Sequence, residues 1–247
     1  MLKRVVIKLS GEAIGSSESV SGYDDAVIDA IVSQIIQVMK AGTQVAVVIG
    51  GGNLWRGQQA RPDMCRVKAD QMGMLATVMN ALYLSEAFKR QSQKAKVITP
   101  MPIGNMTSVY EKEAALEMMN QGIVLINAAG LGHPYFSTDT ITALRAAELE
   151  ADCILFAKSI DGVYDKDPRQ NSTARKFKTL CYNEALHRDL QVADISAMHL
   201  ARDAKISSYV FGLNEPNSIT LACAYPKTGN LQGTYISVTV EEDYYAG

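Results

Sequence analysis

Short apolar, β-branched runs alternate along this chain with longer stretches of helical periodicity, and this alternation restricts the fold more than any other feature. The expected strands occupy 4–10, 44–50, 95–100, 122–128, 152–159, 207–213, 218–224 and 233–240. The expected helices occupy 24–41, 69–90, 110–120, 138–150 and 194–203. Continuously apolar strands separated by helices are typical of parallel strands that are buried on both faces. The pattern therefore predicts an α/β fold, a three-layer αβα sandwich with a mostly parallel central sheet.

The composition fits one such domain and argues against several classes of protein. With 247 residues, of which 47% are hydrophobic, the chain can bury a sizeable core, and we expect a single domain over 1–247 with a frayed tail at 240–247. A net charge of -2 without a basic cluster argues against a nucleic-acid partner. No apolar run reaches the length of a membrane span, and the first one is broken by Lys8, so we expect neither an anchor nor a signal peptide.

The cysteines and histidines do not predict a metal site. Four cysteines form no C-x-x-C pair, and the chain has only three histidines. A zinc site of ordinary spacing is therefore not expected. We interpret all four cysteines as reduced thiols of a cytoplasmic protein, with Cys153 in the core.

Four of the expected strands are followed by glycines, charges and hydroxyl groups. The segments are "KLSGEA" (8–13), "GGGNLWRG" (50–57), "AAGLGHPYFSTD" (128–139) and "AKSIDGVYDKDP" (157–168). Because ligands bind beyond the carboxyl ends of parallel strands, these segments should converge on one edge of the sheet. Glycine turns and basic side chains bind phosphate, so the convergence predicts a phosphate site. Neither GxxxxGK[ST] nor a GxGxxG after the first strand is present, and both common nucleotide motifs are thereby excluded.

Each of these segments taken alone also has a purely structural explanation. Glycines after strands commonly form turns and nothing more. Lys8 is either an edge-strand or a half-exposed lysine, or else a buried cation that needs an anion. Arg56 is either a surface residue or an anion clamp. Asp139 is either a helix cap or a site residue, and Asp70 is a helix cap, a residue on an exposed helix face or a site residue. Trp55 is expected to pack against the protein rather than against a nucleobase.

Five segments taken together resemble the bacterial uridylate (UMP) kinase family of the amino acid kinase superfamily. They are 8–13, 50–57, "ADQMGMLATVMNAL" (69–82), "GHPYFSTD" (132–139) and "DGVYDKDP" (161–168), in this order. The segment 69–82 is similar to the uridylate kinases specifically, whereas the others are shared across the superfamily. The resemblance spans about residues 3–238. It implies an αβα sandwich that catalyses ATP + UMP → ADP + UDP with Mg²⁺.

The resemblance also implies roles for individual residues. The catalytic residues would be Lys8, Arg56 and Asp139. The ATP site would comprise Lys8, Leu9, Ser10, Gly11, Gly52, Arg56, Lys158, Tyr164 and Asp167. The UMP site would comprise Gly51, Asp70, Leu131, Gly132, His133, Pro134, Tyr135, Phe136, Ser137 and Thr138. No direct metal ligand is implied, because Mg²⁺ would be carried by the ATP phosphates. Asp139, and more weakly Asp194, would orient the lysine or the water shell of the metal.

The chain departs from the family pattern before its two aromatic residues. Many members read G-T-G-N-P where this chain has Gly-Leu-Gly-His-Pro at 130–134, so a hydroxyl donor is lost and an imidazole replaces an amide. Lys158 stands where some members carry threonine. Relatives are often hexamers that GTP activates and UTP inhibits, so the resemblance implies a homo-oligomer, a hexamer, with these two effectors.

Two other functions remain open from the sequence. One is a kinase of the same superfamily that acts on a carboxylate, a carbamate or isopentenyl phosphate, and the segment 69–82 argues against it. The other is a non-catalytic nucleotide-binding protein on the same fold. The presence of Lys8, Arg56 and Asp139 argues for an enzyme instead.

Overall fold

The computed structural model describes residues 1–55, 61–224 and 233–245. Its strands are β1 (Arg4–Leu9), β2 (Gln44–Ile49), β3 (Ala95–Thr99), β4 (Ser108–Val109), β5 (Val124–Asn127), β6 (Cys153–Lys158), β7 (Phe177–Cys181), β8 (Ser207–Gly212), β9 (Thr234–Ser237) and β10 (Asp243–Tyr244). Its helices are the 3-10 helix η1 (Gly11–Ile14) and α1 (Asp25–Lys40), α2 (Arg66–Arg90), α3 (Lys112–Asn120), α4 (Thr138–Glu148), α5 (Tyr182–His187), α6 (Ile195–Asp203) and α7 (Ser218–Ala224).

All of these strands belong to one sheet, in the order β10-β7-β9-β8-β6-β1-β2-β5-β3-β4. The pairs from β8 across to β4 are parallel, while β8 with β9 and β7 with β10 are antiparallel. The predicted α/β fold with a mostly parallel central sheet is confirmed. Because β1 lies between β6 and β2, its carboxyl end is at the centre of the sheet edge where ligands bind in such folds.

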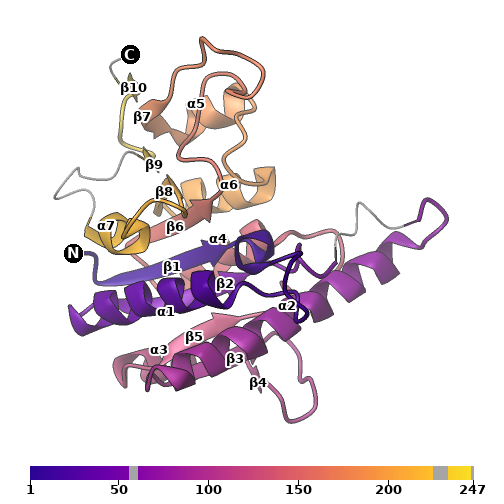
Figure 1. Cartoon of the computed structure of the whole chain (residues 1–247). Coiled ribbons are helices and arrows are strands. Elements are labelled where there is room, and N and C mark those ends of the chain that lie inside the picture. Colours follow the sequence, from indigo (N-terminus) through magenta and orange to yellow (C-terminus); the bar gives the residue numbers. More distant parts are fainter. Residues whose placement is uncertain (56–60, 225–232, 246–247) are drawn as a thin grey trace.

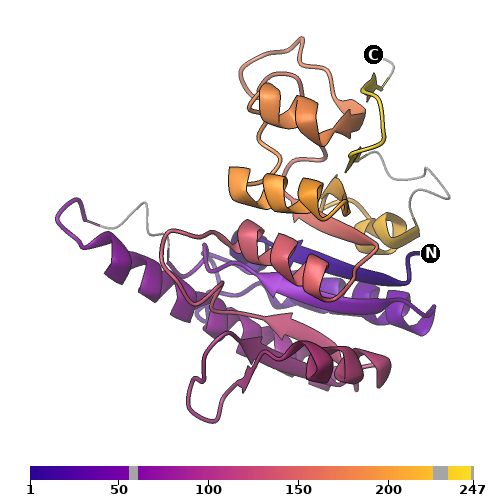
Figure 2. The same ribbon diagram turned by 180° about the vertical axis from the view of Figure 1, so that it is seen from behind.

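Helices cover both faces of the sheet, and each face has its own apolar core (Figures 1 and 2). Val5, Ile7 and Leu9 of β1 belong to the core shared with α1, α2 and α7. Val6, between them, belongs to the opposite core, which contains residues of α3, α4, α5 and α6. This alternation follows from strand geometry, in which successive side chains point to opposite faces. Because both faces are buried, the sequences of the central strands are unbroken apolar runs.

Helix α2 is the longest, with 25 residues, and its N-terminal end projects beyond the sheet (Figures 1 and 2). One face, which includes Ala76, Asn80 and Leu84, is buried against the body of the protein. Met72, Leu75 and Met79 lie on another face and are 41%, 55% and 56% exposed. The helix therefore has an apolar stripe that no other described part of the chain covers.

Two local expectations from the sequence are wrong. Residues 218–224, expected as a strand, form α7, in which Ser218, Ile219, Ala222 and Cys223 are buried at helical spacing. The tail is not frayed over 243–245, since β10 pairs with β7 and the Tyr244 ring lies 4.4 Å from that of Phe177. Residues 246–247 lie outside the described part of the chain.

All four cysteines are free, and Cys153 is buried as expected. Within the residues described, no helix combines the length and the apolar character needed to span a bilayer.

Candidate active site

Lys8 and Asp139 form an ion pair at the carboxyl ends of the central strands. Lys8 is the penultimate residue of β1, and its Nζ lies 2.9 Å from Asp139 Oδ1, with only 14% and 15% of the two side chains exposed. Since β1 is a central strand, Lys8 is not the edge residue that was the alternative. A cation held inside an apolar strand needs a counter-ion, and Asp139 supplies it.

A second lysine lies near this pair. Lys158 ends β6, the neighbour of β1, and its Nζ donates a hydrogen bond to the Val192 carbonyl. Burial lowers the pKa of Lys158, the charge of Asp139 opposes this shift, and the charge of Lys8 adds to it. One carboxylate therefore acts on two ammonium groups. The net charge of Lys8, Lys158 and Asp139 together is positive, which favours a polyanionic ligand.

Asp194 connects the first turns of α4 and α6. It caps α6 by accepting a hydrogen bond from the Ala197 N–H at 2.7 Å. Its other carboxylate oxygen accepts hydrogen bonds from the hydroxyls of Ser137 and Thr140, the latter at 2.8 Å. Ser137 in turn caps α4 by accepting from the Asp139 N–H at 2.9 Å. The cap of α4 is thus Ser137, and Asp139 is left to pair with Lys8.

The triple-glycine loop packs closely between η1 and α2. A Cβ atom placed on Gly11 would lie 2.7 Å from both Gly50 O and Gly52 N. One placed on Gly51 would lie 2.9 Å from Ala76 Cβ and 3.0 Å from Gly73 O, both in α2. Side chains at Gly11 and Gly51 would therefore force these elements apart. The close packing of the backbone already requires the glycines.

Asp70 borders a small pocket beside this loop. The pocket has a volume of about 160 Å³ and is lined in part by Gly51, Asp70 and Phe136. Asp70 is the fifth residue of α2, whose N-cap is Cys65, so the capping explanation for Asp70 is wrong. Its carboxylate accepts hydrogen bonds from Arg66 Nε at 2.8 Å and from the Tyr135 N–H at 2.8 Å. The acid is therefore already oriented toward the loop that closes the pocket.

The loop after β5 reaches this pocket through several left-handed residues. Ala129 has φ 60° and Tyr135 φ 70°, conformations that cost non-glycine residues free energy. The Ala129 N–H donates to Thr77 Oγ1 at 2.7 Å, which ties the loop to α2.

The residues predicted for the UMP site divide into two groups. Those that line the small pocket are Gly51, Asp70, His133, Phe136 and Thr138. Leu131 is instead partly buried against the second apolar core, and Gly132 lies against Pro100. Pro134 is half-buried, and the Ser137 hydroxyl donates a hydrogen bond to Asp194. Tyr135 is 68% exposed and contributes its N–H to Asp70.

A larger hollow of about 430 Å³ lies where the segment after β6 passes α5. Its lining includes Tyr164, Asp167 and Arg188. The hydroxyl of Tyr164 donates to Asp161 at 2.8 Å, and Lys176 Nζ lies 2.7 Å from the same carboxylate. Two of the residues predicted for the ATP site therefore meet here, while Lys158 is at the Lys8 pair instead.

The remaining predicted ATP-site residues belong to the first two loops. Ser10 is the N-cap of η1, Gly11 follows it, and Gly52 lies against Gly11. Leu9 is fully buried, so only its backbone is left for a ligand. Arg56 lies outside the described residues.

Three residues with a place at this site were not singled out from the sequence. They are Arg66, which holds Asp70, and the buried pair Asn80 and Tyr23. Asn80 had a detectable signal, because an asparagine on the inward face of an apolar helix needs hydrogen-bond partners.

No group of three or more histidine, cysteine, aspartate or glutamate side chains in the described ranges is arranged to hold a metal ion. The acidic oxygen atoms beside the Lys8 ammonium, the ligand type that Mg²⁺ prefers, come from Asp139.

Comparisons with known proteins identify the family to which this fold belongs. Residues 3–212 match the model of the amino acid kinase family. A uridylate kinase from Streptococcus thermophilus is 46% identical over 219 residues, which cover 88% of this chain and 89% of that protein. The crystal structure of UMP kinase from Bacillus anthracis superposes with a TM-score of 0.92 at 32% identity and covers 99% of both chains. UMP kinase from Ureaplasma parvum gives a TM-score of 0.87 at 34% identity, over 95% of this chain and 98% of that one. The chain therefore belongs to the amino acid kinase family, and within it to the uridylate kinases.

Proposed function

We propose that this chain transfers the γ-phosphoryl group of ATP to UMP and releases UDP and ADP. The observation that carries the proposal is the Lys8–Asp139 ion pair at the centre of the sheet edge. Asp139 follows Thr138, which lines the smaller pocket, and Lys158 precedes Ile160, which lines the larger one. The cationic centre thus lies where a donor and an acceptor phosphate could meet.

UMP is assigned to the smaller pocket. Asp70 would bind the ribose hydroxyls, with Gly51 and the segment 131–138 around the phosphate and uracil. Support comes from Gly51, Asp70 and Phe136, which all line that pocket. The two family departures then differ in their expected effect on UMP binding, since Leu131 is partly buried against the apolar core and His133 lines the pocket.

ATP is assigned to the larger hollow and the first two loops. Tyr164 and Asp167 would lie around the adenosine, and the phosphates would run past 9–11 and Gly52 toward Lys8 and Lys158. Arg56 would supply a further positive charge. The accumulation of ammonium groups around Asp139 supports this direction for the triphosphate.

The reaction needs positioning and charge neutralisation rather than a general base. The attacking group is a phosphate oxygen of UMP, which is already ionised near neutral pH. Lys8 would stabilise the charge on the phosphoryl group in transit, and Asp139 holds Lys8 in place through the 2.9 Å ion pair. Mg²⁺ carried on the ATP phosphates would neutralise their charge, and Asp139 is the carboxylate placed to order its water shell.

We further propose a cytoplasmic, single-domain enzyme that assembles into a homo-oligomer, a hexamer as in many relatives. The single continuous sheet supports one domain, and the free thiols support a reducing compartment. The uncovered stripe on α2 supports self-association. Activation by GTP and inhibition by UTP remain predictions from the family.

An assay of ADP release across acceptors tests the activity. The full chain with ATP and Mg²⁺ is offered UMP, CMP, dUMP, a carboxylate, carbamate or isopentenyl phosphate, each with and without GTP. We expect kcat/KM to be highest for UMP. Preference for a non-nucleotide acceptor would assign another kinase activity, and tight binding of ATP and UMP without ADP release would assign a binding protein.

A further inference from the structure

The carboxamide of Asn80 is buried at the centre of the loop contacts, with 0% of the residue exposed. Its Nδ2 donates hydrogen bonds to Gly50 O and to Asn53 Oδ1, both at 2.7 Å. Its Oδ1 accepts from the Tyr23 hydroxyl at 3.0 Å and from Asn53 Nδ2 at 3.3 Å. Both donors and both acceptor positions of the amide are therefore used, which fixes its orientation.

These hydrogen bonds tie α2 to the triple-glycine loop and to Tyr23, and Asn53 of that loop in turn packs against the first loop. Gly50 begins the triple-glycine loop, and Asn53 ends it. A Cβ atom placed on Gly11 would lie 2.7 Å from Asn53 Oδ1, and one placed on Gly15 would lie 2.6 Å from Asn53 Cβ. The Asn53 side chain thus fills the space between the ends of η1 and Asn80. The amide pair of the buried Asn80 and the half-buried Asn53 sets the position of the first loop, the glycine loop and α2 relative to each other.

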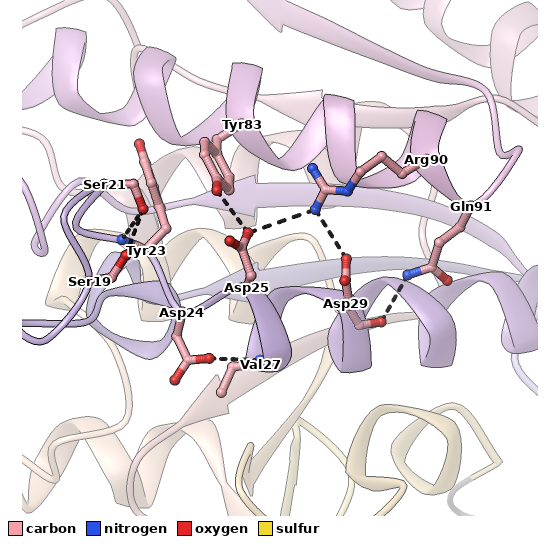
Figure 3. Close-up of polar contacts among 10 residues, drawn as sticks. All are labelled: Ser19, Ser21, Tyr23, Asp24, Asp25, Val27, Asp29, Tyr83, Arg90 and Gln91. Atoms are coloured by element: carbon pink, nitrogen blue, oxygen red, sulfur yellow. Dashed lines mark hydrogen bonds and ion pairs between the residues drawn. The ribbon is translucent and has the colours of Figure 1, made fainter.

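Tyr23 holds Asn80 from the side away from the loop. Its ring stacks on Tyr83 of α2 with the centroids 3.9 Å apart (Figure 3). Tyr23 is 6% exposed, and burial raises the pKa of its phenol, so the hydroxyl stays protonated as a donor. Tyr83 directs its own hydroxyl elsewhere, to Asp25 Oδ1 at 2.8 Å, and Asp25 and Asp29 pair with Arg90 (Figure 3).

We propose that Asn80 is a positioning residue for phosphoryl transfer, which holds the loop 50–53 against the first loop, and that Tyr23 keeps its amide in the required orientation. The inference rests on the proposed function, because the loop is placed between ATP and UMP there. The position of the loop matters most in the transition state, where both phosphates must be in line. Loss of the amide should therefore lower kcat more than it raises either KM.

Asn80→Asp tests this directly, because it keeps the shape and the acceptor for Tyr23 but removes the donors to Gly50 and Asn53. We expect kcat to fall by about tenfold to a hundredfold, as misplacement of reacting groups by an ångström does, with each KM changed less than about threefold. UMP binding is measured separately by the fluorescence of Trp55, the only tryptophan of the chain, which lines the small pocket.

Tyr23→Phe and Tyr83→Phe form a matched pair. Each removes one phenolic hydroxyl from the same stacked rings, but only Tyr23 donates to Asn80. We expect kcat to fall severalfold in Tyr23→Phe and to stay within about twofold in Tyr83→Phe, at temperatures well below the measured Tm of each variant. This pair also decides the question if Asn80→Asp does not fold.

The outcomes separate the inference from the proposed function. A wild-type chain that does not phosphorylate UMP refutes the function, and the inference fails with it. If the wild type phosphorylates UMP, two results overturn the inference and leave the proposed function standing. One is an unchanged kcat in Asn80→Asp, and the other is an equal kcat in Tyr23→Phe and Tyr83→Phe. A lowered Tm with native kcat in Asn80→Asp would show a purely structural role and would also overturn it.

Discussion

At the scale of single residues, the site depends on one cation at a position where burying a charge costs desolvation free energy. Lys8 lies in a central strand and is 14% exposed, with Asp139 as its ion-pair partner. A buried ion pair of this kind is poor evidence for stability, because desolvation offsets much of the attraction. A role in the chemistry is the better reason for a lysine at this point.

Lys8→Met should therefore impair the reaction far more than binding. The methionine keeps the apolar stem and removes the charge, so the transferring phosphoryl group loses its stabilisation. We expect kcat to fall by about 10²- to 10³-fold, as for loss of a single charge-stabilising donor, while the Kd for UMP from Trp55 fluorescence changes little. Near-normal turnover in steady-state assays would remove Lys8 from the catalytic group.

Gly51 and Gly73 face each other across the contact between the glycine loop and α2, and they should respond in opposite ways to alanine. A Cβ on Gly51 meets Ala76 Cβ at 2.9 Å, whereas a Cβ on Gly73 meets only Trp55 Cδ1 at 3.7 Å. We expect Gly51→Ala to lower the free energy of unfolding by about 1–3 kcal/mol through overpacking.

Gly73→Ala should instead raise that free energy by about 0.5–1 kcal/mol, because alanine favours the helix. Urea denaturation of both variants measures the difference. Equal values, or a more stable Gly51→Ala, would show that the loop is not held as tightly as its contacts indicate.

The sequence indicated the residue types at the site but not their partners. Asp70 and Asp139 each had a capping explanation, and the structure assigns the caps to Cys65 and Ser137. These assignments depend on where a helix begins to within one or two residues, which local sequence rarely determines. The partners of Asn80 come from two other segments, the loop 50–53 and the turn before α1 that carries Tyr23, so its role required the tertiary fold.

At the scale of elements, Asp194 joins the first turns of two helices that lie side by side. The two carboxylate oxygens of Asp194 serve different partners, Ala197 N–H on one and the Ser137 and Thr140 hydroxyls on the other. Asp194→Asn has a single acceptor oxygen, so with that oxygen capping α6 the two hydroxyls lose their acceptor. We expect the free energy of unfolding to fall by about 1–3 kcal/mol, the usual loss when hydrogen bonds to a charged group are broken. Turnover should fall as well, because Asp139 lies on the same turn as Ser137.

Asp24→Asn is the matched control for that change. Asp24 caps α1 through a single hydrogen bond from the Val27 N–H at 3.0 Å, and asparagine is an equally good cap. Its stability should stay within about 0.5 kcal/mol of the wild type. Chemical denaturation and kcat are measured on both variants. If they behave alike, Asp194 is a helix cap and nothing more.

Periodicity predicted the long elements well and the short ones poorly. Helices α1 and α6 begin and end within one residue of their predicted ranges. The apolar run 218–224 suggests a strand, although its buried positions 218, 219, 222 and 223 follow a helical spacing. Seven residues are too few to separate a buried strand from a buried helix by periodicity alone.

At the scale of the whole molecule, the convergence of the strand ends was predictable, because neighbouring parallel strands end at the same edge of the sheet. Strands β1, β2, β5 and β6 are neighbours in the sheet, so the loops after them had to meet. The docking of the tail as β10 was not predictable, because it depends on β7, a strand of five residues that the periodicity did not reveal. The part of α2 that projects beyond the sheet bears on a different property, the assembly of several copies of this chain.

The stripe of Met72, Leu75 and Met79 on α2 should be an interface between copies of this chain. The three side chains occur at intervals of three and four residues on one face, and they are exposed on the helix that projects furthest from the sheet (Figure 1). A two-fold axis would bring the same stripe of two copies together and bury both.

Leu75→Glu would place a charge in the middle of that contact, so its molar mass by light scattering should fall to a smaller assembly. Val20→Glu is the control, because it also replaces an exposed apolar residue with glutamate, in a loop before α1. It should keep the wild-type mass. An unchanged mass for Leu75→Glu would mean that the copies associate through another surface, and a monomeric wild type would mean that the stripe meets a different partner.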